Sequence, residues 1–508
     1  MTYPGMKQHQ KDLLMEYGPR LKDIDESYIK DLYYPILDQV YGIMEDKVAP
    51  YVKKWDEEGA KFVNGKVQFP QGVLEAYNAL VRDKSGLRLF EAFLPEEYDG
   101  VGLPPLMAGV IMETIASYDL SLQVTIGLST TLIEAIGLYP TPELTGKYFP
   151  MLQEGAAGYV GFTEPDAGSN LKNLKATSTL DGDDYVVKGT KIWISNAGYA
   201  DLGLVLARNI VDGKDEGMNA FIIENSMPNA DGNGGPGVVC SRLEEKIGLH
   251  SSSTGVLEFN VRVPKENVIG QVGKGYQRIL ERLMGMRMGV AFQSIALADR
   301  AYELAKAYGE ERHQFNKPIA SFPGVANKLT GMEKELMRMR RLGFEASYVL
   351  SRSQQKLTVN PNYLKVDADG QAMLDSFPLY SAAVVAFTVS RAKMYNSEVG
   401  WIITDDALQI FGGNGLAKEY NVERLLRDFR VLRIYEGTSE IQEGILDRTK
   451  AAAKAKDLDS LMALAEQTGR PEPEFKPLDY NKIFFTRFPK SVDAFKDENN
   501  EDFYLYKN

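Results

Sequence analysis

The sequence predicts an α+β protein, with a helical N-terminal domain, a β-barrel or β-sandwich middle domain and a C-terminal antiparallel helical bundle. Two changes in hydrophobic period predict this order. Apolar residues recur every three to four positions up to about residue 154, alternate in short β-rich runs from about 158 to 270, and then recur at the helical spacing again. The length of 508 residues suits two or three domains with ample core.

The helical N-terminal domain is expected over residues 1–156. Its first long segment, Tyr28–Gly59, has the apolar spacing of an amphipathic helix. The segment Leu103–Gly137 is more continuously apolar, which is typical of helices buried in a core. We therefore expect the later helices to form the interior of this domain.

The middle β domain is expected over 157–270, because its short β-rich runs are separated by turn residues such as Asp181–Asp184. Evenly spaced short strands favour a small barrel or sandwich. Long amphipathic helices then predict the bundle over 271–453. The polar segment Ser351–Gly370 is expected to be a loop insertion. The extension 454–508 mixes aromatic residues with proline and charge, so we expect it to pack on a surface.

Composition excludes several classes of function. A net charge of −12 and a pI near 5.1 argue against a nucleic-acid partner, which would require a basic face. The single cysteine, Cys240, rules out an internal disulfide framework and favours a reducing compartment. The three histidines lie far apart in sequence, so no metal site is expected. No leader and no bilayer-length apolar run is evident, and we expect a cytoplasmic protein without a membrane span.

The most informative motif places Glu436 between Tyr435 and Gly437. Glycine permits backbone conformations that let a ligand approach the main chain closely. A carboxylate held there is a candidate general base if a pocket excludes water and adjusts its pKa. The alternative interpretation is an exposed glutamate in a loop.

Four further motifs precede this one along the chain. In order, the five segments are Tyr159–Asn170, Gly189–Ala200, Arg312–Ile319, Ala407–Asp428 and Ile434–Glu440. Together they resemble, in the same order, the flavin-dependent acyl-CoA dehydrogenase family, over residues from about Ile29 to Arg448. The resemblance implies a three-domain fold, bound FAD and an acyl-CoA substrate.

The first half of the predicted flavin site lies in the β domain. Trp193 offers an aromatic wall for a planar ring, and Ser195, two residues further along a strand, is expected on the same face. The alternative is a core tryptophan. The resemblance implies that Phe162, Thr163 and Ser169 also line the flavin, with Ser169 touching CoA as well. The family often has Thr at position 195 and usually Asp at position 170, where this chain has Ser and Asn.

The second half lies in the bundle. Arg312 is a permanently charged donor suited to a pyrophosphate, and paired glycines permit close backbone approach. The resemblance implies that this group reaches the FAD of a neighbouring subunit, and hence a homodimer or homotetramer; its members are Arg312, Phe315, Gln409, Gly412 and Gly413. It also places Thr438 and Glu440 near the pyrophosphate. Phe322–Pro323 stands where relatives often have His-Gln.

The resemblance also bears on the catalytic base. In some branches of the family the base precedes an arginine on the first bundle helix, but here Met286 precedes the matching Arg287. This leaves Glu436 as the expected base, with its own backbone amide in the oxyanion hole. The positions that match CoA contacts are Ser169, Arg287, Gly437 and Arg448, whereas Met284 replaces an aspartate contact.

The sequence therefore predicts α,β-dehydrogenation of an acyl-CoA thioester to the 2-enoyl-CoA, with electrons passed to an electron-transfer flavoprotein. Two alternatives stay open: an acyl-CoA oxidase that uses O2, and a non-catalytic flavin-binding member of the fold. The acyl chain is not determined, because the helical residues that would line its pocket cannot be oriented from one sequence.

Overall fold

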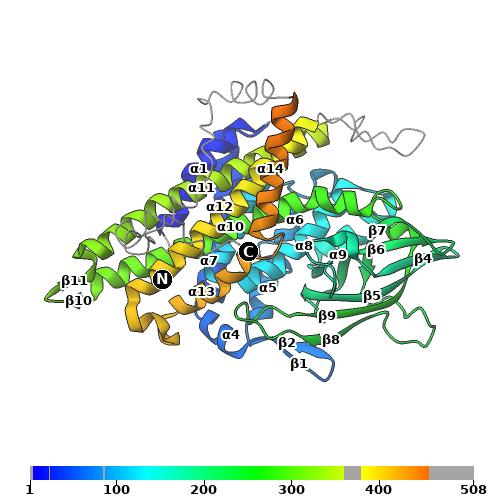
Figure 1. Ribbon diagram of the computed structural model, residues 1–508, viewed down its shortest axis with the longest axis horizontal. Helices are drawn as coiled ribbons and strands as arrows, with labels where there is room; N and C mark the ends of the chain where they lie inside the picture. The colour runs from blue at the N-terminus through cyan, green and yellow to red at the C-terminus, as the bar shows by residue number, and fades with distance from the viewer. Residues whose placement is uncertain (1–3, 22, 84–85, 360–378, 457–508) are drawn as a thin grey trace, which may run out of the picture. The chain divides into compact units, whose positions relative to one another are not determined.

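A computed structural model describes residues 4–21, 23–83, 86–359 and 379–456. The chain forms two compact units, 1–451 and 452–508, and the first contains all of the elements discussed below except the end of the last helix. The predicted fold class is confirmed, because helices, then one large sheet, then a helical bundle follow one another along the chain (Figure 1). The limits 156/157, 270/271 and 453/454 remain our proposed domain boundaries.

The N-terminal helices bury two long apolar members, α7 and α8. Asp119 begins α8 and accepts a hydrogen bond from the Leu122 amide at 2.7 Å, which satisfies one free donor of the first turn. By length and composition α8 could cross a membrane, but 72% of that window is buried inside the protein, as in a core helix. The α-helices are α1 (Pro4–Tyr17), α2 (Glu26–Tyr28), α3 (Tyr34–Ile43), α4 (Val52–Glu58), α5 (Val73–Val81), α6 (Leu89–Phe93), α7 (Pro105–Tyr118), α8 (Leu120–Leu138) and α9 (Pro142–Gln153).

One hairpin interrupts the helices that the sequence predicts. Strands β1 (Lys61–Val63) and β2 (Lys66–Gln68) pair antiparallel. They are joined by Asn64 and Gly65, whose φ angles of 51° and 76° are those of a tight two-residue hairpin turn. The sequence analysis did not identify this hairpin, for which the Asn-Gly pair was the available signal.

The middle domain is a seven-stranded mixed sheet in the order β3-β6-β4-β5-β9-β8, with β7 on the other side of β6. The long strands β5 and β9 pair antiparallel, with a register shift between Lys191 and Ile194. That shift matters for the site described below. The strands are β3 (Gly158–Gly161), β4 (Thr177–Asp181), β5 (Asp184–Ser195), β6 (Leu202–Val211), β7 (Lys214–Glu224), β8 (Val238–Leu243) and β9 (Thr254–Pro264).

The bundle packs long helices closely, and small residues allow this. A Cβ on Gly109 of α7 would lie 2.5 Å from the Phe292 ring of α10, and one on Gly400 of α12 would lie 2.5 Å from the ring of Phe429. The elements are α10 (Gly275–Glu311), the hairpin β10 (His313–Gln314) and β11 (Lys317–Pro318), α11 (Pro323–Val359), α12 (Leu379–Phe411), α13 (Val422–Phe429) and α14 (Ser439–Lys456).

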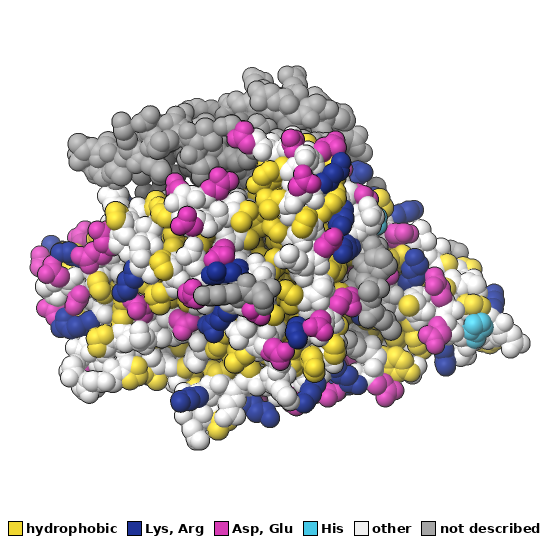
Figure 2. Space-filling view, turned by 180° about the vertical axis from the view of Figure 1, so that it is seen from behind, with side chains coloured by type: hydrophobic (Ala, Val, Ile, Leu, Met, Phe, Trp, Pro, Cys, Tyr) yellow, Lys and Arg dark blue, Asp and Glu magenta, His cyan; other side chains and the backbone are white. Residues whose placement is uncertain are grey.

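The predicted loop insertion is wrong in its first part. Helix α11 continues through Val359, because residues 351–359 contain neither glycine nor proline to end it. The rest of the insertion, 360–370, and residues 457–508 of the C-terminal extension lie outside the described residues. On the face shown in Figure 2, acidic and basic side chains are interspersed.

Candidate active site

The predicted base lies in a short segment, residues 434–438, which we call the carboxylate loop; it connects the turn ending at Arg433 to α14. Glu436 and Gly437 both have left-handed backbone conformations, with φ of 56° and 91°. A Cβ at Gly437 would lie 2.8 Å from Nε2 of Gln442. The glycine is therefore required both for its φ and for the close approach of α14.

Three buried donors from three helices hold the carboxylate loop by its carbonyl groups. Arg287 Nε of α10 donates to the Glu436 carbonyl at 3.1 Å, and Lys393 Nζ of α12 donates to the Gly437 carbonyl at 2.8 Å. Gln442 Nε2 of α14 donates to both carbonyls, at 3.1 and 3.0 Å. Among the described residues, none donates a hydrogen bond to the Glu436 carboxylate in the structure. The loop is thus fixed through its backbone, and its carboxylate stays available for a proton.

The electrostatics of the loop suit a general base. Burial raises the pKa of Glu436 to about 7, against the opposing charges of Arg287 and Lys393. Burial lowers the pKa of Lys393 to about 8, although Glu398 and Glu436 favour its charged form. A carboxylate with a pKa near neutrality can exist as the base and still bind a proton strongly.

Buried polar side chains connect the carboxylate loop to α8. The Tyr435 hydroxyl donates to Oε1 of Gln293 on α10 at 2.5 Å, and Nε2 of Gln293 donates to Oε1 of Gln123 on α8. Gln123 and Gln293 are both buried. The aromatic residue beside the base is therefore fixed in orientation by an amide pair that spans two helices.

The first predicted flavin group forms a surface that we call the aromatic wall, residues 162–164 and 192–195. The Ile192 amide donates to the Thr163 carbonyl at 2.9 Å and joins the two segments. Trp193 has a φ of 60° and is 55% exposed, so it is not a core tryptophan. The register shift at this point interrupts the alternation from which we expected Trp193 and Ser195 to share a face. Ser195 instead lies 3.4 Å, Oγ to Oγ1, from Thr254.

A buried ion pair supports the aromatic wall from beneath. Lys191 is fully buried, and its Nζ donates to Glu164 Oε1 at 2.7 Å, to the Leu206 carbonyl at 2.7 Å and to the Phe162 carbonyl at 3.3 Å. The backbone amides of Lys175 and Ala176 also donate hydrogen bonds to the Glu164 carboxylate. Sequence reasoning named the flanking residues but missed this pair.

Helix α8 brings the aromatic wall and the carboxylate loop toward each other. Asn196, directly after Ser195, donates to the carbonyl of Thr125 on α8 at 3.0 Å and to that of Gly158 at 2.8 Å. Gln123, two residues before Thr125, carries the contact to the carboxylate loop described above. Both predicted groups are therefore linked to one short stretch of α8, the aromatic wall through Asn196 and the carboxylate loop through Gln293.

The second predicted flavin group gathers at the far end of the bundle. The rings of Tyr308 and Phe411 stack with centroids 4.1 Å apart, which joins the C-terminal ends of α10 and α12. All five predicted residues there are exposed, Phe315 to 88%. The β10–β11 hairpin lies at the opposite end of the first unit from the large sheet (Figure 1). One copy of the chain therefore does not bring the two halves of the predicted flavin site together.

The remaining predicted residues have varied environments. Arg287 is only 5% exposed and holds the carboxylate loop, so its contact with CoA stays a prediction. Glu440 lies in the first turn of α14, and a hydrogen bond from Thr438 lowers its pKa. Ser169 lies exposed in the turn after the aromatic wall. The side chain of Arg448 is outside the described ones.

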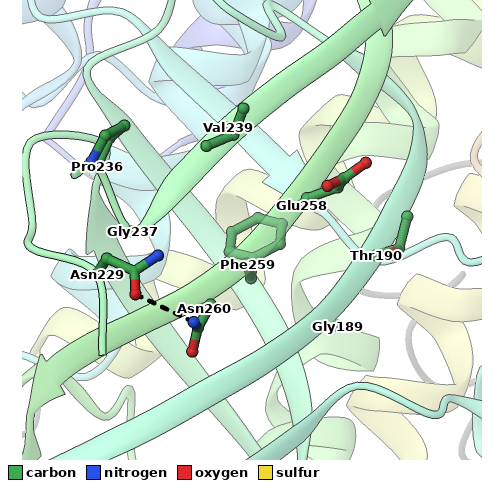
Figure 3. A pocket seen from close by; sticks show the side chains of 9 residues that line it. All are labelled: Gly189, Thr190, Asn229, Pro236, Gly237, Val239, Glu258, Phe259 and Asn260. Atoms are coloured by element: carbon green, nitrogen blue, oxygen red, sulfur yellow. Dashed lines mark hydrogen bonds between the residues drawn. The ribbon is translucent and has the colours of Figure 1, made fainter. Parts of the chain in front are cut away.

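Sequence reasoning also missed Lys393 and Gln442. The available signal was the position of Lys393 on the apolar face of a helix, because Val389 and Ser397, four residues to either side, are fully buried. A separate hollow of about 330 Å³ lies on the large sheet (Figure 3). It contains none of the predicted site residues, and its lining is Gly189, Thr190, Asn229, Pro236, Gly237, Val239, Glu258, Phe259 and Asn260.

The donor set fits FAD. An exposed, backbone-strained tryptophan offers a face for a planar ring, and Arg312 offers an exposed charged donor for a pyrophosphate. Gly412, with a φ of 60° and open space around it, permits close approach of a ligand. Together with a carboxylate whose pKa is near 7, these features define a class of flavin-dependent oxidoreductases with a protein base.

Comparison with known proteins places the chain within that class. Three family models match in order: the acyl-CoA dehydrogenase N-terminal domain at 35–156, the middle domain at 160–261 and the C-terminal domain at 273–373 and 381–450. A short-chain-specific acyl-CoA dehydrogenase of Clostridium acetobutylicum is 32% identical over 356 residues, 69% of this chain and 84% of that protein. The chain belongs to the acyl-CoA dehydrogenase family.

Solved structures agree with this assignment. An acyl-CoA dehydrogenase of Bacillus anthracis complexed with FAD aligns with a TM-score of 0.72 and 28% identity, over 88% of this chain and 70% of that one. A chain solved in work on the electron transferring flavoprotein of Acidaminococcus fermentans aligns with a TM-score of 0.68 and 28% identity, over 84% and 98%. The protein is thus an FAD-binding oxidoreductase of this family.

Proposed function

We propose that the protein catalyses α,β-dehydrogenation of an acyl-CoA thioester to the 2-enoyl-CoA, with Glu436 as the base. The observation that carries this proposal is that the carbonyls of the carboxylate loop, and not its carboxylate, accept hydrogen bonds from buried side chains. Burial, which raises the pKa of Glu436 to about 7, agrees with this role. Met286 leaves no carboxylate at the alternative position on α10.

The residues divide the chemistry between them. Glu436 removes the proton next to the thioester carbonyl, and its backbone amide donates to the carbonyl oxygen as negative charge develops there. Trp193 supports the flavin ring, and the Ser195 hydroxyl donates to it. When bound, FAD supplies the acceptor for the hydride that leaves the neighbouring carbon. The residues proposed to contact CoA are Ser169, Arg287, Gly437 and Arg448.

We further propose that two copies complete each flavin site. One copy contributes the aromatic wall, together with Ser169, Thr438 and Glu440. The second contributes its exposed bundle end, because the two groups lie at opposite ends of the same unit. A homodimer is the smallest assembly that satisfies this, and a homotetramer would also do so.

Reoxidation is proposed to pass through an electron-transfer flavoprotein in the cytoplasm. The relation to a chain from work on such a flavoprotein supports this choice of acceptor. Turnover should then be slow with oxygen and fast with the flavoprotein or a ferrocenium dye. Stoichiometric peroxide at the dye-supported rate would instead assign an acyl-CoA oxidase.

The test of the base is anaerobic reduction of the flavin in the Glu436→Gln holoprotein by a panel of acyl-CoA thioesters, beginning with butyryl-CoA. We expect a loss of at least ~10²-fold in the reduction rate, with the yellow flavin retained. Glu443→Gln, an exposed residue on α14, is the matched control and should reduce normally. Near-normal reduction in Glu436→Gln would exclude this base. Absence of reduction in the unmodified protein by every thioester would point to a non-catalytic flavin-binding role.

A further inference from the structure

Lys393 is a buried cation at the candidate site that the proposed chemistry does not use. It lies on α12, its side chain is fully buried, and its Nζ is 2.8 Å from the Gly437 carbonyl oxygen. Burying an ammonium group costs free energy unless nearby groups compensate. An aliphatic residue would fill the same space without this cost, so the presence of the charge calls for an explanation.

The hydrogen bond alone does not explain the charge. The Gly437 carbonyl also accepts from Gln442 Nε2 at 3.0 Å, and the Glu436 carbonyl accepts from both Arg287 and Gln442. The carboxylate loop would therefore keep three of its four tethers without Lys393. The further contribution of Lys393, from α12, is a positive charge next to Glu436, which must be ionised to act as a base.

We propose that Lys393 is a positioning residue whose ammonium group holds the Gly437 carbonyl and keeps Glu436 ionised as the base. This inference rests on the proposed function of Glu436. In our assignment Lys393 contacts neither the acyl group nor the flavin. The protonation state of Lys393 would nevertheless influence the rate of the reaction.

Several elements around the carboxylate loop contribute charged or titratable groups, and Asp428 of α13 is one of them because its charge acts on Tyr435. Arg287 of α10 and Lys393 favour the charged form of Glu436. Glu398 of α12 and Glu440 of α14 favour the charged form of Lys393, whereas Arg287 opposes it. Tyr435, the neighbour within the loop, stays neutral because burial raises its pKa. The two cations thus act together on a single carboxylate.

The two ionisations define a pH window. Burial places the pKa of Glu436 at about 7 and that of Lys393 at about 8, so carboxylate and ammonium coexist mainly between these values. Because the groups interact, they titrate as a pair. A cation favours the charged form of a carboxylate, so removing Lys393 should raise the pKa of Glu436.

The experiment compares the pH dependence of anaerobic flavin reduction by butyryl-CoA in the unmodified holoprotein, Lys393→Met and Lys393→Arg. In Lys393→Met we expect the ionisation midpoint to rise by about one pH unit, and the rate at pH 7 to fall roughly fivefold and recover at higher pH. Lys393→Arg, which keeps the charge, should restore the midpoint. A merely structural role would lower the rate at all pH values without moving the midpoint.

A second measurement needs no Lys393 variant and no turnover. Infrared titration of the carboxyl band of the unmodified holoprotein, with Glu436→Gln identifying the band, should show the Glu436 signal responding in two steps, the second when Lys393 deprotonates. A single-step titration, or an unmoved midpoint in Lys393→Met while Glu436→Gln is inactive, would overturn this inference alone. Normal activity in Glu436→Gln would overturn the proposed function instead.

Discussion

The site contains two fully buried lysines that serve different purposes. Lys191, beneath the aromatic wall, donates to a carboxylate and two carbonyls within hydrogen-bonding distance. Lys393, beside the carboxylate loop, donates to one carbonyl and acts on Glu436 through its charge. Burial lowers the pKa of both lysines to about 8. The two sites therefore differ in the hydrogen bonding of the nearby carboxylate, Glu164 or Glu436, and not in the pKa of the lysine.

Glu164 and Glu436 show what that difference means. The Glu164 carboxylate accepts from Lys191 and from two backbone amides, so it is fully occupied and forms part of a rigid support for the aromatic wall. The Glu436 carboxylate accepts from none of the described residues and has a raised pKa. A carboxylate whose hydrogen bonding is complete forms part of a scaffold, whereas a carboxylate without such donors can exchange a proton.

The largest effect on stability should come from breaking the complete pair. Glu164→Gln leaves a buried lysine without a counter-charge, and we expect a loss of about 3–5 kcal/mol in the free energy of unfolding. The control lies in the same turn: Asp166 pairs with Lys175 on the surface, where solvent screens the charges, so Asp166→Asn should have a far smaller effect. Urea unfolding of the three proteins makes the comparison. Equal effects would mean that the buried pair is not a scaffold.

Substitution of Glu436, whose carboxylate accepts no hydrogen bond from the described residues, should have the opposite effect on stability. The pKa of Glu436 is higher when folded than the ordinary 4.5, so the folded state binds the extra proton, and stability falls as pH rises from about 4.5 to 7. Glu436→Gln removes this pH-dependent loss of stability, because glutamine does not titrate. We expect the variant to be more stable than the unmodified protein by at most about 3 kcal/mol above pH 7, with the difference vanishing toward pH 4.5.

Thermal unfolding across this pH range would measure that effect. A variant less stable than the unmodified protein at high pH would show that the Glu436 carboxylate makes favourable contacts of its own, and the contrast with Glu164 would be lost.

Replacing glycine by alanine should have smaller effects on the free energy of unfolding, with opposite signs in the carboxylate loop and in the bundle. At Gly437 alanine must adopt a φ of 91° and place its Cβ 2.8 Å from Gln442 Nε2, so Gly437→Ala should cost about 1–3 kcal/mol. Gly331, exposed within α11, has open space around it, and Gly331→Ala should stabilise by roughly 0.5–1 kcal/mol. Urea unfolding should give opposite signs. The same sign for both would show that the loop relaxes around the new methyl group.

The three-part fold could be predicted from the sequence because the hydrophobic period follows burial directly. Glu436 and Trp193 could be predicted as site residues because they lie in recognisable motifs. The sequence did not predict the register shift at Trp193, which depends on pairing with β9. Nor did it predict Lys191, Lys393 or Gln442, since a buried polar residue is recognised only when its partners, far away in sequence, are known. The hairpin at 61–68 was not identified, and the loop predicted from Ser351 was wrong in its first part because residues 351–359 contain no helix-ending residue.

The smallest effect on the folded chain, but a decisive one for assembly, should come from Arg312→Ala. Arg312 is exposed at the end of α10, so the free energy of unfolding of one copy should change by less than about 0.5 kcal/mol. If a second copy supplies this residue to the flavin, purified Arg312→Ala should contain less FAD, and its apoprotein should dissociate more readily. Flavin absorbance per chain and sedimentation velocity measure the two quantities. Full FAD occupancy in an unchanged oligomer would show that each copy completes its own site, and that the aromatic wall and the carboxylate loop need no third region.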